Sequence, residues 1–328
     1  MRRTKHLILA VFILLQLQSG LAFAQGAAEV FPSKPIVMVV PFAAGGPVEL
    51  ECRMYIPGLT SQLGQQVVID FKPGGASLIG IAYVAKSRPD GYAIVAVSTS
   101  LTVLPAFHKD LPYDTLRDLT PILLMSRQQS ALLVHPAFPA KNLAEYIAYA
   151  RANPEKINYG TGGAGAISHL AGAWLHSLSG TKVTFVHHKS TGPMLLEVQS
   201  GRIDAGSGLL VGTMPMIKAG KVRALAVLGD QRSSQLPDLG TAAEQGVTGY
   251  NYSGWIGFLG AGGTPAPIAN KLSDAFAKVV RLPEIVAELD RQGSVPVGSS
   301  PAQFRQVIAT ELVRWKKVVD DAGLKLQE

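Results

Sequence analysis

The chain has 328 residues, a formal net charge of +7 and one cysteine. Its positive charge is not gathered into a cluster or stripe of Lys and Arg, which argues against a nucleic-acid-binding surface and favours anionic small molecules as partners. A single cysteine excludes an internal disulfide and a thiolate metal cluster, and we expect Cys52 to be buried.

The first 24 residues are typical of a secretory signal peptide. Three basic residues lie within positions 1–5, an apolar run follows at 7–17, and residues 22–24 form an A-x-A site. The alternative, an uncleaved membrane anchor, is disfavoured because the apolar run is too short to span a bilayer comfortably. Cleavage after Ala24 would remove 24 of the 328 residues and three positive charges, which leaves 304 residues and a net charge of +4. We therefore expect a protein that is free in the periplasm, with enough chain for two domains.

After this segment, apolar strands alternate with amphipathic helical stretches. Strands are expected at residues 35–42, 66–71 and 92–100. A helical pattern at 49–64 contains Pro57, which should kink or interrupt it. Residues 74–92 are typical of a glycine loop, a short helix and a turn.

A second unit of the same kind begins near residues 121–136. It continues with a helix at 143–156, a strand and glycine loop at 157–163, and a helix at 166–180. The tail is again helical, at 265–293 and 300–323. Strands that alternate with helices in this way favour a mainly parallel, doubly wound α/β sheet.

The stretch INYGTGGAGAISHLAG, residues 157–172, matches the dinucleotide-binding spacing G-x-G-x-x-G at Gly160, Gly162 and Gly165. NAD is disfavoured, because no Asp or Glu to bind a ribose follows about twenty residues later. A secreted chain also has little access to soluble nicotinamide cofactor. We expect no cofactor, and we expect the loop to bind another anion or simply to make a tight turn.

Three strand ends share small residues: PFAAGGP at 41–47, STS at 98–100 and GTGGAGAIS at 160–168. Small residues expose backbone N–H groups, and a following helix adds the positive end of its dipole. In a doubly wound sheet these loops lie at the carboxyl ends of strands, where ligands bind. Their recurrence in both halves predicts an anion-binding cleft between two domains.

Catalytic and metal-binding patterns are weak. Ser168 and His169 are adjacent, and neighbours on a helix point in different directions, so they do not suit a nucleophile and its base. His187 and His188 lack further ligands at metal-binding spacing. Trp255 could line the cleft or pack in the core. We expect no catalytic residue and no metal.

Several segments together resemble a known family. They read FPSKPIVMVVPFAAGG, LGQQVVIDFKPGG, AKSRPDGYAI, YGTGGAGAISHLAG, LLEVQSGRIDAG, IKAGKVRALAVLGDQRS, LPDLGTAAEQG and WIGFLGAGGTPAPIANKL. In this order they are similar to the Bug (TctC-type) periplasmic solute-binding proteins of tripartite tricarboxylate transporters, over essentially the whole mature chain. The resemblance implies two doubly wound domains with a hinge, a type II periplasmic binding protein fold, and no catalysis. We place domain 1 at 25–128 plus 252–328 and domain 2 at 129–251.

The resemblance also implies that loop backbone groups bind a ligand carboxylate between the domains. The candidate ligand-binding residues are Phe42, Ala43, Ala44, Gly45, Gly46, Glu49, Ser98, Thr99, Ser100, Thr161, Gly162, Ala164, Gly165, Ser168, His187, His188, Lys189 and Trp255. Relatives commonly have Thr-Asp where this chain has Val48-Glu49, and Pro-Tyr where it has His187-His188. We hypothesise that His187, His188 and Lys189 lie at the cleft rim and select a second anionic group; the alternative is a pair of surface or packing histidines.

The function expected from these patterns is capture of a carboxylate, a di- or tricarboxylate of aliphatic or aromatic type. The expected partners are this ligand and the membrane subunits of a tripartite tricarboxylate transporter, and the receptor is expected to be a monomer. Two alternatives remain open: a secreted enzyme of similar fold, and a sensory binding protein that presents its ligand to a signalling partner.

Overall fold

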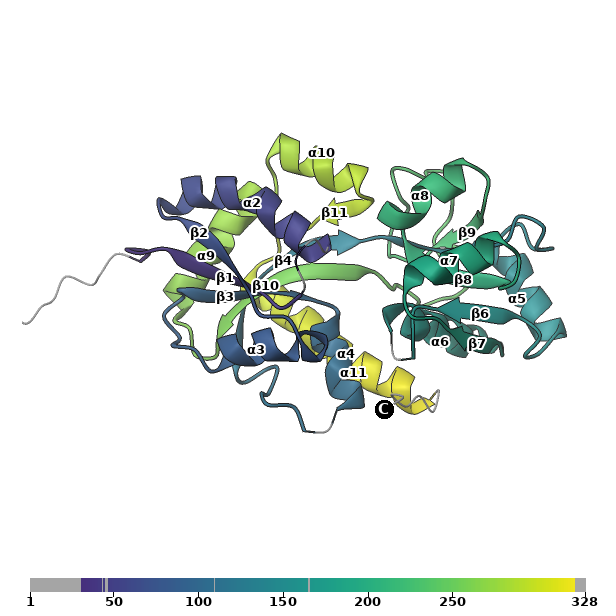
Figure 1. The fold of residues 1–328 in the computed structure, drawn as a ribbon, viewed down its shortest axis with the longest axis horizontal. Helices are drawn as coiled ribbons and strands as arrows, with labels where there is room; N and C mark the ends of the chain where they lie inside the picture. The colour runs from purple at the N-terminus through teal and green to yellow at the C-terminus, as the bar shows by residue number, and fades with distance from the viewer. Residues whose placement is uncertain (1–30, 43, 45–46, 109, 165, 322–328) are drawn as a thin grey trace, which may run out of the picture.

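The computed structural model describes residues 31–42, 44, 47–108, 110–164 and 166–321. The expected signal peptide and its cleavage site lie outside these residues. Two β-sheets, each covered by helices, form two lobes that lie side by side (Figure 1). None of the helices in the described ranges is long and apolar enough to cross a membrane.

The first lobe contains a six-stranded sheet in the order β11-β4-β10-β3-β1-β2. Its strands are β1 (Ile36–Val40), β2 (Val67–Phe71), β3 (Ala93–Ser98), β4 (Leu119–Gln128), β10 (Gly254–Ala261) and β11 (Ser294–Pro296). Its helices are α2 (Pro47–Leu63), α3 (Leu78–Ala85), α4 (Ser100–Phe107), α9 (Ala266–Val279), α10 (Pro283–Arg291) and α11 (Pro301–Asp321), with a short 3-10 helix at Gly75–Ser77.

The second lobe contains a five-stranded sheet in the order β7-β6-β8-β5-β9. Its strands are β5 (Ser130–Val134), β6 (Asn158–Thr161), β7 (Thr184–His187), β8 (Ala205–Leu209) and β9 (Arg223–Val227). Its helices are α5 (Leu143–Ala152), α6 (Ile167–Ser179), α7 (Thr191–Gln199) and α8 (Leu210–Lys218).

Both sheets are mixed rather than mainly parallel, and the crossings between the lobes explain the difference. Strands β1, β2 and β3 are parallel, and β10 runs antiparallel to β3 and β4. In the second sheet β6, β7 and β8 are parallel, and β5 runs antiparallel to β8 and β9. The chain enters β5 and β10 from the other lobe, so each starts at the edge where its parallel neighbours end; β11, which is antiparallel to β4, follows α10 within the first lobe.

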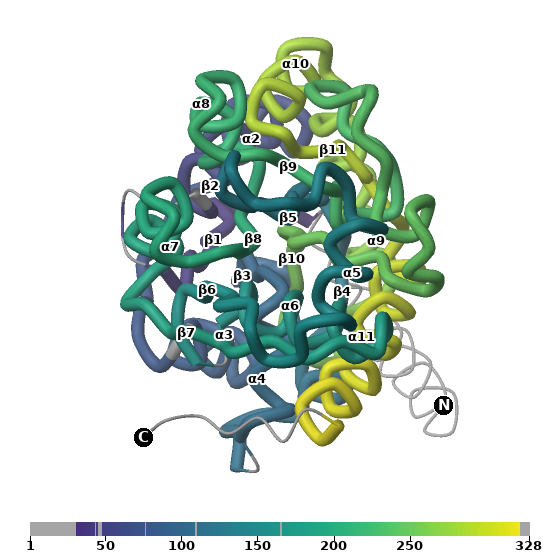
Figure 2. The backbone as a smooth tube through the Cα atoms, turned by 90° about the vertical axis from the view of Figure 1, so that its right-hand side faces the viewer, coloured from purple at the N-terminus to yellow at the C-terminus, as the bar shows by residue number. Residues whose placement is uncertain are grey.

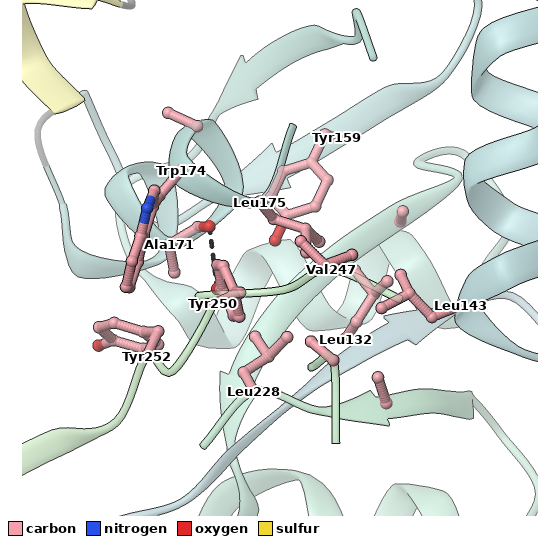
Figure 3. Packing of buried hydrophobic residues seen from close by; sticks show 14 of the residues in the cluster. Leu132, Leu143, Tyr159, Ala171, Trp174, Leu175, Leu228, Val247, Tyr250 and Tyr252 are labelled. Atoms are coloured by element: carbon pink, nitrogen blue, oxygen red, sulfur yellow. Dashed lines mark hydrogen bonds between the residues drawn. The ribbon is translucent and has the colours of Figure 1, made fainter. Parts of the chain in front are cut away.

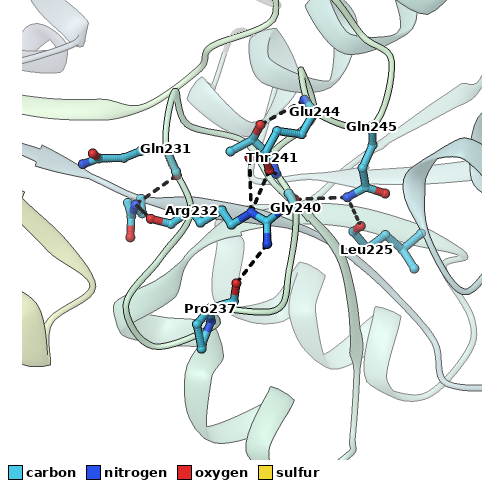
Figure 4. A network of polar contacts seen from close by, with 9 residues as sticks. Leu225, Gln231, Arg232, Pro237, Gly240, Thr241, Glu244 and Gln245 are labelled. Carbon is cyan, nitrogen blue, oxygen red and sulfur yellow. Dashed lines mark hydrogen bonds and ion pairs between the residues drawn. The ribbon is translucent and has the colours of Figure 1, made fainter.

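The chain passes from the first sheet to the second at Gln129, between β4 and β5, and returns between β9 and β10. The return segment has little regular structure, and a polar network orders it (Figure 4). Arg232 Nε donates to Glu244 Oε2 at 2.9 Å, and the amide of Gln245 donates to the carbonyl of Leu225 at 2.9 Å. The first contact joins two parts of the segment, and the second fastens the segment to β9 of the second lobe. The domain boundaries at 128–129 and 251–252 stay a prediction.

Helix α11 contacts both lobes. It packs on β4 and α4 of the first lobe and on α6 of the second, and Figure 2 shows it running past both α4 and α6. Near its end, the Trp315 ring meets Trp174 edge to face, with centroids 5.8 Å apart. Trp174 belongs to the second-lobe core, where the Tyr250 hydroxyl donates to the Ala171 carbonyl at 3.0 Å (Figure 3).

Two local features complete the first lobe. Helix α2 continues through Pro57 without interruption. Proline removes one backbone N–H···O hydrogen bond, but the burial of residues such as Tyr55 and Leu59 in the first-lobe core outweighs that loss. Cys52 lies on the same buried face, as expected. Helix α4, which the sequence did not predict, starts directly after the strand-end loop at Ser98–Thr99 and contains Pro105.

Candidate functional site

A cavity of about 490 Å³ lies where the two sheets meet. Its volume is in the range of small-molecule sites. The residues that line it come from both lobes and from the crossings: Ser98, Thr99, Gln128, Ser130, Ala166, Ile167, Ser168, Thr191, Gly192, Leu195, Ser207, Gly208, Leu209, Val211, Gly212, Tyr252, Gly254 and Trp255.

Three helices of the second lobe begin at the cavity wall. They are α6, α7 and α8, which start at Ile167, Thr191 and Leu210. None of their N-cap residues makes a side-chain capping hydrogen bond. The first N–H of α8, that of Leu210, already donates to the Gln129 carbonyl at 2.9 Å. The starts of α6 and α7 and the positive ends of the three helix dipoles favour a negatively charged ligand.

Two buried hydroxyl groups of cavity-lining residues have no hydrogen-bond partner in the described part of the chain. They belong to Ser130 and Tyr252, whose residues are 2% and 3% exposed. Burial raises the pKa of Tyr252, so its phenol keeps its proton at neutral pH. Buried polar groups are normally paired; these two hydroxyl groups have no such partner among the described residues, and both oxygens are shielded from solvent rather than exposed on the cavity surface.

The first-lobe wall is fixed by a buried carboxylate. Trp255 Nε1 donates to Glu311 Oε2 at 2.9 Å, and the Thr102 hydroxyl donates to the same oxygen at 2.8 Å. The backbone N–H of Trp255 donates to Thr99 Oγ1 at 3.3 Å. Burial raises the pKa of Glu311, and these hydrogen bonds oppose that rise. Trp255 therefore lines the cavity and is also part of the core, where its ring meets Phe304.

The glycine loop after β6 supports the second-lobe wall from behind. The Gly162 N–H donates to Ser168 Oγ at 2.8 Å. A Cβ on Gly162 would lie 2.9 Å from Thr191 Oγ1 and 3.0 Å from Thr191 N. Thr161, Gly162 and Ala164 do not line the cavity, whereas Ser168 does. The loop thus positions the starts of α6 and α7.

The histidine segment is placed beside this loop, and none of its residues lines the cavity. His187 Nδ1 lies 2.7 Å from Thr161 Oγ1, and its ring is edge to face with His169 at 4.7 Å. Burial and the neighbouring His188 lower the pKa of His187. The backbone N–H of His188 donates to the Thr161 carbonyl at 3.0 Å, and Lys189 is exposed.

The remaining candidates are placed as follows. Phe42, Ala44, Glu49 and Ser100 are not among the cavity-lining residues. Glu49 is buried and forms an ion pair with Arg53 at 2.5 Å. The candidates Ala43, Gly45, Gly46 and Gly165 lie outside the described residues. Of the candidates that the structure describes, four line the cavity: Ser98, Thr99, Ser168 and Trp255.

The sequence did not single out most of the other lining residues. Ser130 and Tyr252 lie next to the two crossings, Thr191 starts α7, and Ser207 lies in the middle of β8. The segment KSTG follows β7, and the segment GSGLL covers the end of β8. Both contain the same small residues as the three strand-end loops from which an anion-binding cleft was predicted. That shared composition was the available signal.

The described lining carries neither a metal cluster nor a catalytic pair. The described residues contain no group of three or more His, Cys, Asp or Glu that could bind a metal. The lining residues include hydroxyl groups but no His, Lys, Asp or Glu that could activate one.

Comparisons with known proteins agree on one family. The family model described as the tripartite tricarboxylate transporter family receptor, TctC, matches residues 52–324. Protein BugT of Bordetella pertussis is 30% identical over 322 residues, which cover 98% of each chain.

Two solved structures from Rhodopseudomonas palustris are also similar to this chain. A protein solved with adipate is 30% identical, with a TM-score of 0.74 over 90% of this chain and 100% of its own. MatC, solved with bound malate, is 29% identical, with a TM-score of 0.70 over 88% of this chain and 100% of its own. Together with the two-lobed fold, these matches show that the chain belongs to the TctC (Bug) family of tripartite tricarboxylate transporter receptors.

Proposed function

We propose that this protein is a periplasmic solute-binding receptor that captures a carboxylate and delivers it to the membrane subunits of a tripartite tricarboxylate-type transporter. The N-terminal sequence supports export, with cleavage after Ala24. Family membership supports a receptor rather than an enzyme.

The observation that carries the proposal is the cavity where α6, α7 and α8 begin together. A carboxylate there would accept hydrogen bonds from uncapped N–H groups and face three positive dipole ends. Such a site binds an anion without a basic side chain.

Relatives support the same class of ligand, since one was solved with adipate and another with malate. Both are dicarboxylates, in line with the di- or tricarboxylate expected from the sequence. Ligand between the lobes would stabilise a closed arrangement, because only that arrangement lets both walls contact it.

The test is isothermal calorimetry on residues 25–328 with a series of mono- and dicarboxylates and their neutral amides. At least one carboxylate should bind, and its amide should bind far more weakly, because the amide lacks the charge that the helix dipoles favour. Equal affinity for acid and amide, or no binding by any acid, would reject the receptor function. Periplasmic and cytoplasmic fractions of expressing cells, probed for the cleaved chain, test the location.

A further inference from the structure

We propose that a contact between the lobes, on the far side of the first crossing from the ligand cavity, opposes closure, so that breaking this contact tightens ligand binding. It joins the end of α10 in the first lobe to Ser234 and Gln235 in the return segment, and we call it the outer contact. The inference rests on the proposed function, since it concerns the closure that a captured ligand would stabilise.

The outer contact consists of hydrogen bonds from second-lobe side chains to the last turn of α10. The Ser234 hydroxyl donates to the Asp290 carboxylate. Gln235 Nε2 donates to the carbonyl oxygens of Asp290 and Arg291. Ser234 and Gln235 move with the second lobe, because the adjacent Leu236 packs against a core cluster of that lobe. The outer contact therefore holds one lobe against the other.

The order of the strands separates the outer contact from the ligand cavity. In the first sheet, β4 lies between β11, which directly follows α10, and the strands β10 and β3, whose ends line the cavity. In the second sheet, β5 lies between β9, which leads into the return segment, and β8, whose end lines the cavity. The crossing from β4 to β5 thus runs between the two.

Side chains along this crossing point to the two sides in turn. Gln128 and Ser130 line the ligand cavity, whereas Gln129 between them lines a second cavity, of about 640 Å³. This alternation is that of an extended chain, whose successive side chains point to opposite faces. Ser234 and Asp290 line the second cavity as well. The outer contact and the ligand cavity therefore lie on opposite sides of the crossing.

A rotation that narrows one side of a pivot widens the other side. Helix α11 contacts both lobes and packs on β4, the strand that leads into the crossing, so a closing rotation that keeps α11 in place pivots close to the crossing. Narrowing the ligand cavity then draws Ser234 away from Asp290. The outer contact stabilises the arrangement described here relative to the closed one, and it lowers the apparent affinity of a ligand that binds the closed arrangement.

The test is a charge series at Ser234, which is exposed, as is Asp290, so the variants should fold. Calorimetry at pH 7 and low salt uses whichever of adipate, malate, hexanoate and benzoate binds the wild type most tightly. Ser234→Ala should tighten binding about threefold, and Ser234→Asp, which repels Asp290, should tighten it further. Ser234→Lys can pair with Asp290 and should weaken binding about threefold.

The sign of these effects separates closure from a general effect of charge. An added lysine attracts an anionic ligand and an added aspartate repels it, so long-range electrostatics alone gives the reverse order. Ala219→Lys and Ala219→Asp are the matched controls, because Ala219 is exposed directly after α8 and lines neither cavity. They should show the reverse order or no change. In an Asp290→Ala background the Ser234 series should lose its order, because the partner is gone.

Three results would overturn the inference and leave the proposed function in place. They are weaker binding by Ser234→Ala than by the wild type, equal affinity across the Ser234 series, and an unchanged order in the Asp290→Ala background. Failure of all four acids to bind the wild type would overturn the proposed function and this inference with it.

Discussion

The two lobes build their halves of the cavity wall by different means. The first lobe uses side chains: Trp255 is fixed through its indole N–H to the buried carboxylate of Glu311. The second lobe uses main chain: three helix starts, with a glycine loop packed behind Thr191. The position of a wall made of side chains depends on which residues form and support it. The position of a wall made of backbone depends on whether the space behind it is filled. The two lobes should therefore respond to mutation in different ways.

The largest expected effect comes from removing the first-lobe support. Glu311→Ala leaves the Trp255 N–H and the Thr102 hydroxyl without their buried acceptor, so we expect a loss of about 3 kcal/mol in the free energy of unfolding. Ligand affinity should also fall, because Trp255 lines the cavity. Urea unfolding and calorimetry measure the two effects.

A matched control lies in the same lobe. Glu51 is also buried, and it accepts hydrogen bonds from the Tyr55 and Ser126 hydroxyl groups. Neither of these donors lines the cavity. Glu51→Ala should therefore lower stability by a similar amount without changing the affinity of the folded protein. Equal losses of affinity in both variants would show that Glu311 acts only through general stability.

The second-lobe wall should respond to added volume. Gly162→Val would push on the backbone of Thr191, and overpacking of about 1–3 kcal/mol should weaken ligand binding about 10- to 100-fold with the fold retained. Gly162→Ala should have a smaller effect in the same direction. Gly229→Ala is its control, since an added Cβ there meets only the Gln231 carbonyl at 3.8 Å. Unchanged affinity in a folded Gly162→Val protein would reject the supporting role of the loop.

The lobes should also differ in their response to acid. Burial lowers the pKa of His176, at the last turn of α6, from 6.5 to about 3. Below pH 6.5 the unfolded chain takes up a proton on His176 that the folded chain does not. The contribution of this histidine to the free energy of unfolding is therefore fully present above pH 6.5 and decreases as the pH is lowered. Between pH 7 and 5 this histidine should account for about 2 kcal/mol of lost unfolding free energy.

The variant His176→Gln isolates this contribution. Its unfolding free energy should change less between pH 7 and 5 than that of the wild type, as measured with urea at both pH values. In the first lobe, burial raises the pKa of Glu51 and Glu311, which gives the opposite sign: their contribution to stability decreases as the pH rises through the raised pKa. An identical pH dependence in wild type and His176→Gln would contradict the assignment.

The smallest effect is expected from the histidine segment. His187 and His188 contact Thr161 rather than the cavity, so the double variant His187→Gln, His188→Gln should change affinity by less than about twofold. The hypothesis that they select a second anionic group instead requires tighter binding of a dianion at mildly acidic pH, which the double variant would lose. Dissociation constants measured from about pH 5.5 to 8 for both proteins separate the two outcomes.

The sequence predicted the alternation of strands and helices because strands such as β1, β3 and β5 are short, buried apolar runs. It did not predict that β5 and β10 run against their neighbours, since direction depends on which lobe the chain enters from. Helix α4 was missed because SLTVLPAF has no polar face and contains Pro105. Such a segment, mostly buried, has no amphipathic signal.

For the site, composition at strand ends identified Ser98, Thr99 and Ser168, which line the cavity. It did not identify Ser130 or Tyr252. Each is one hydroxyl in an otherwise apolar or mixed segment, and its significance lies in the missing hydrogen-bond partner, which only tertiary structure reveals. The sequence predicted that the glycine loop binds the ligand directly, whereas in the structure Gly162 of this loop packs against Thr191, which lines the cavity.

The position of α11 limits how the lobes can move. One continuous helix packs on β4 and α4 at one end and on α6 at the other. A wide separation of the lobes would have to break the contact between Trp174 and Trp315 or unwind the helix. Motion that keeps both contacts is restricted to a rotation pivoting near the helix, with the largest displacement on the far side of the molecule. The helix therefore lies close to the hinge axis, and the lobes would separate by rotation about it rather than by translation.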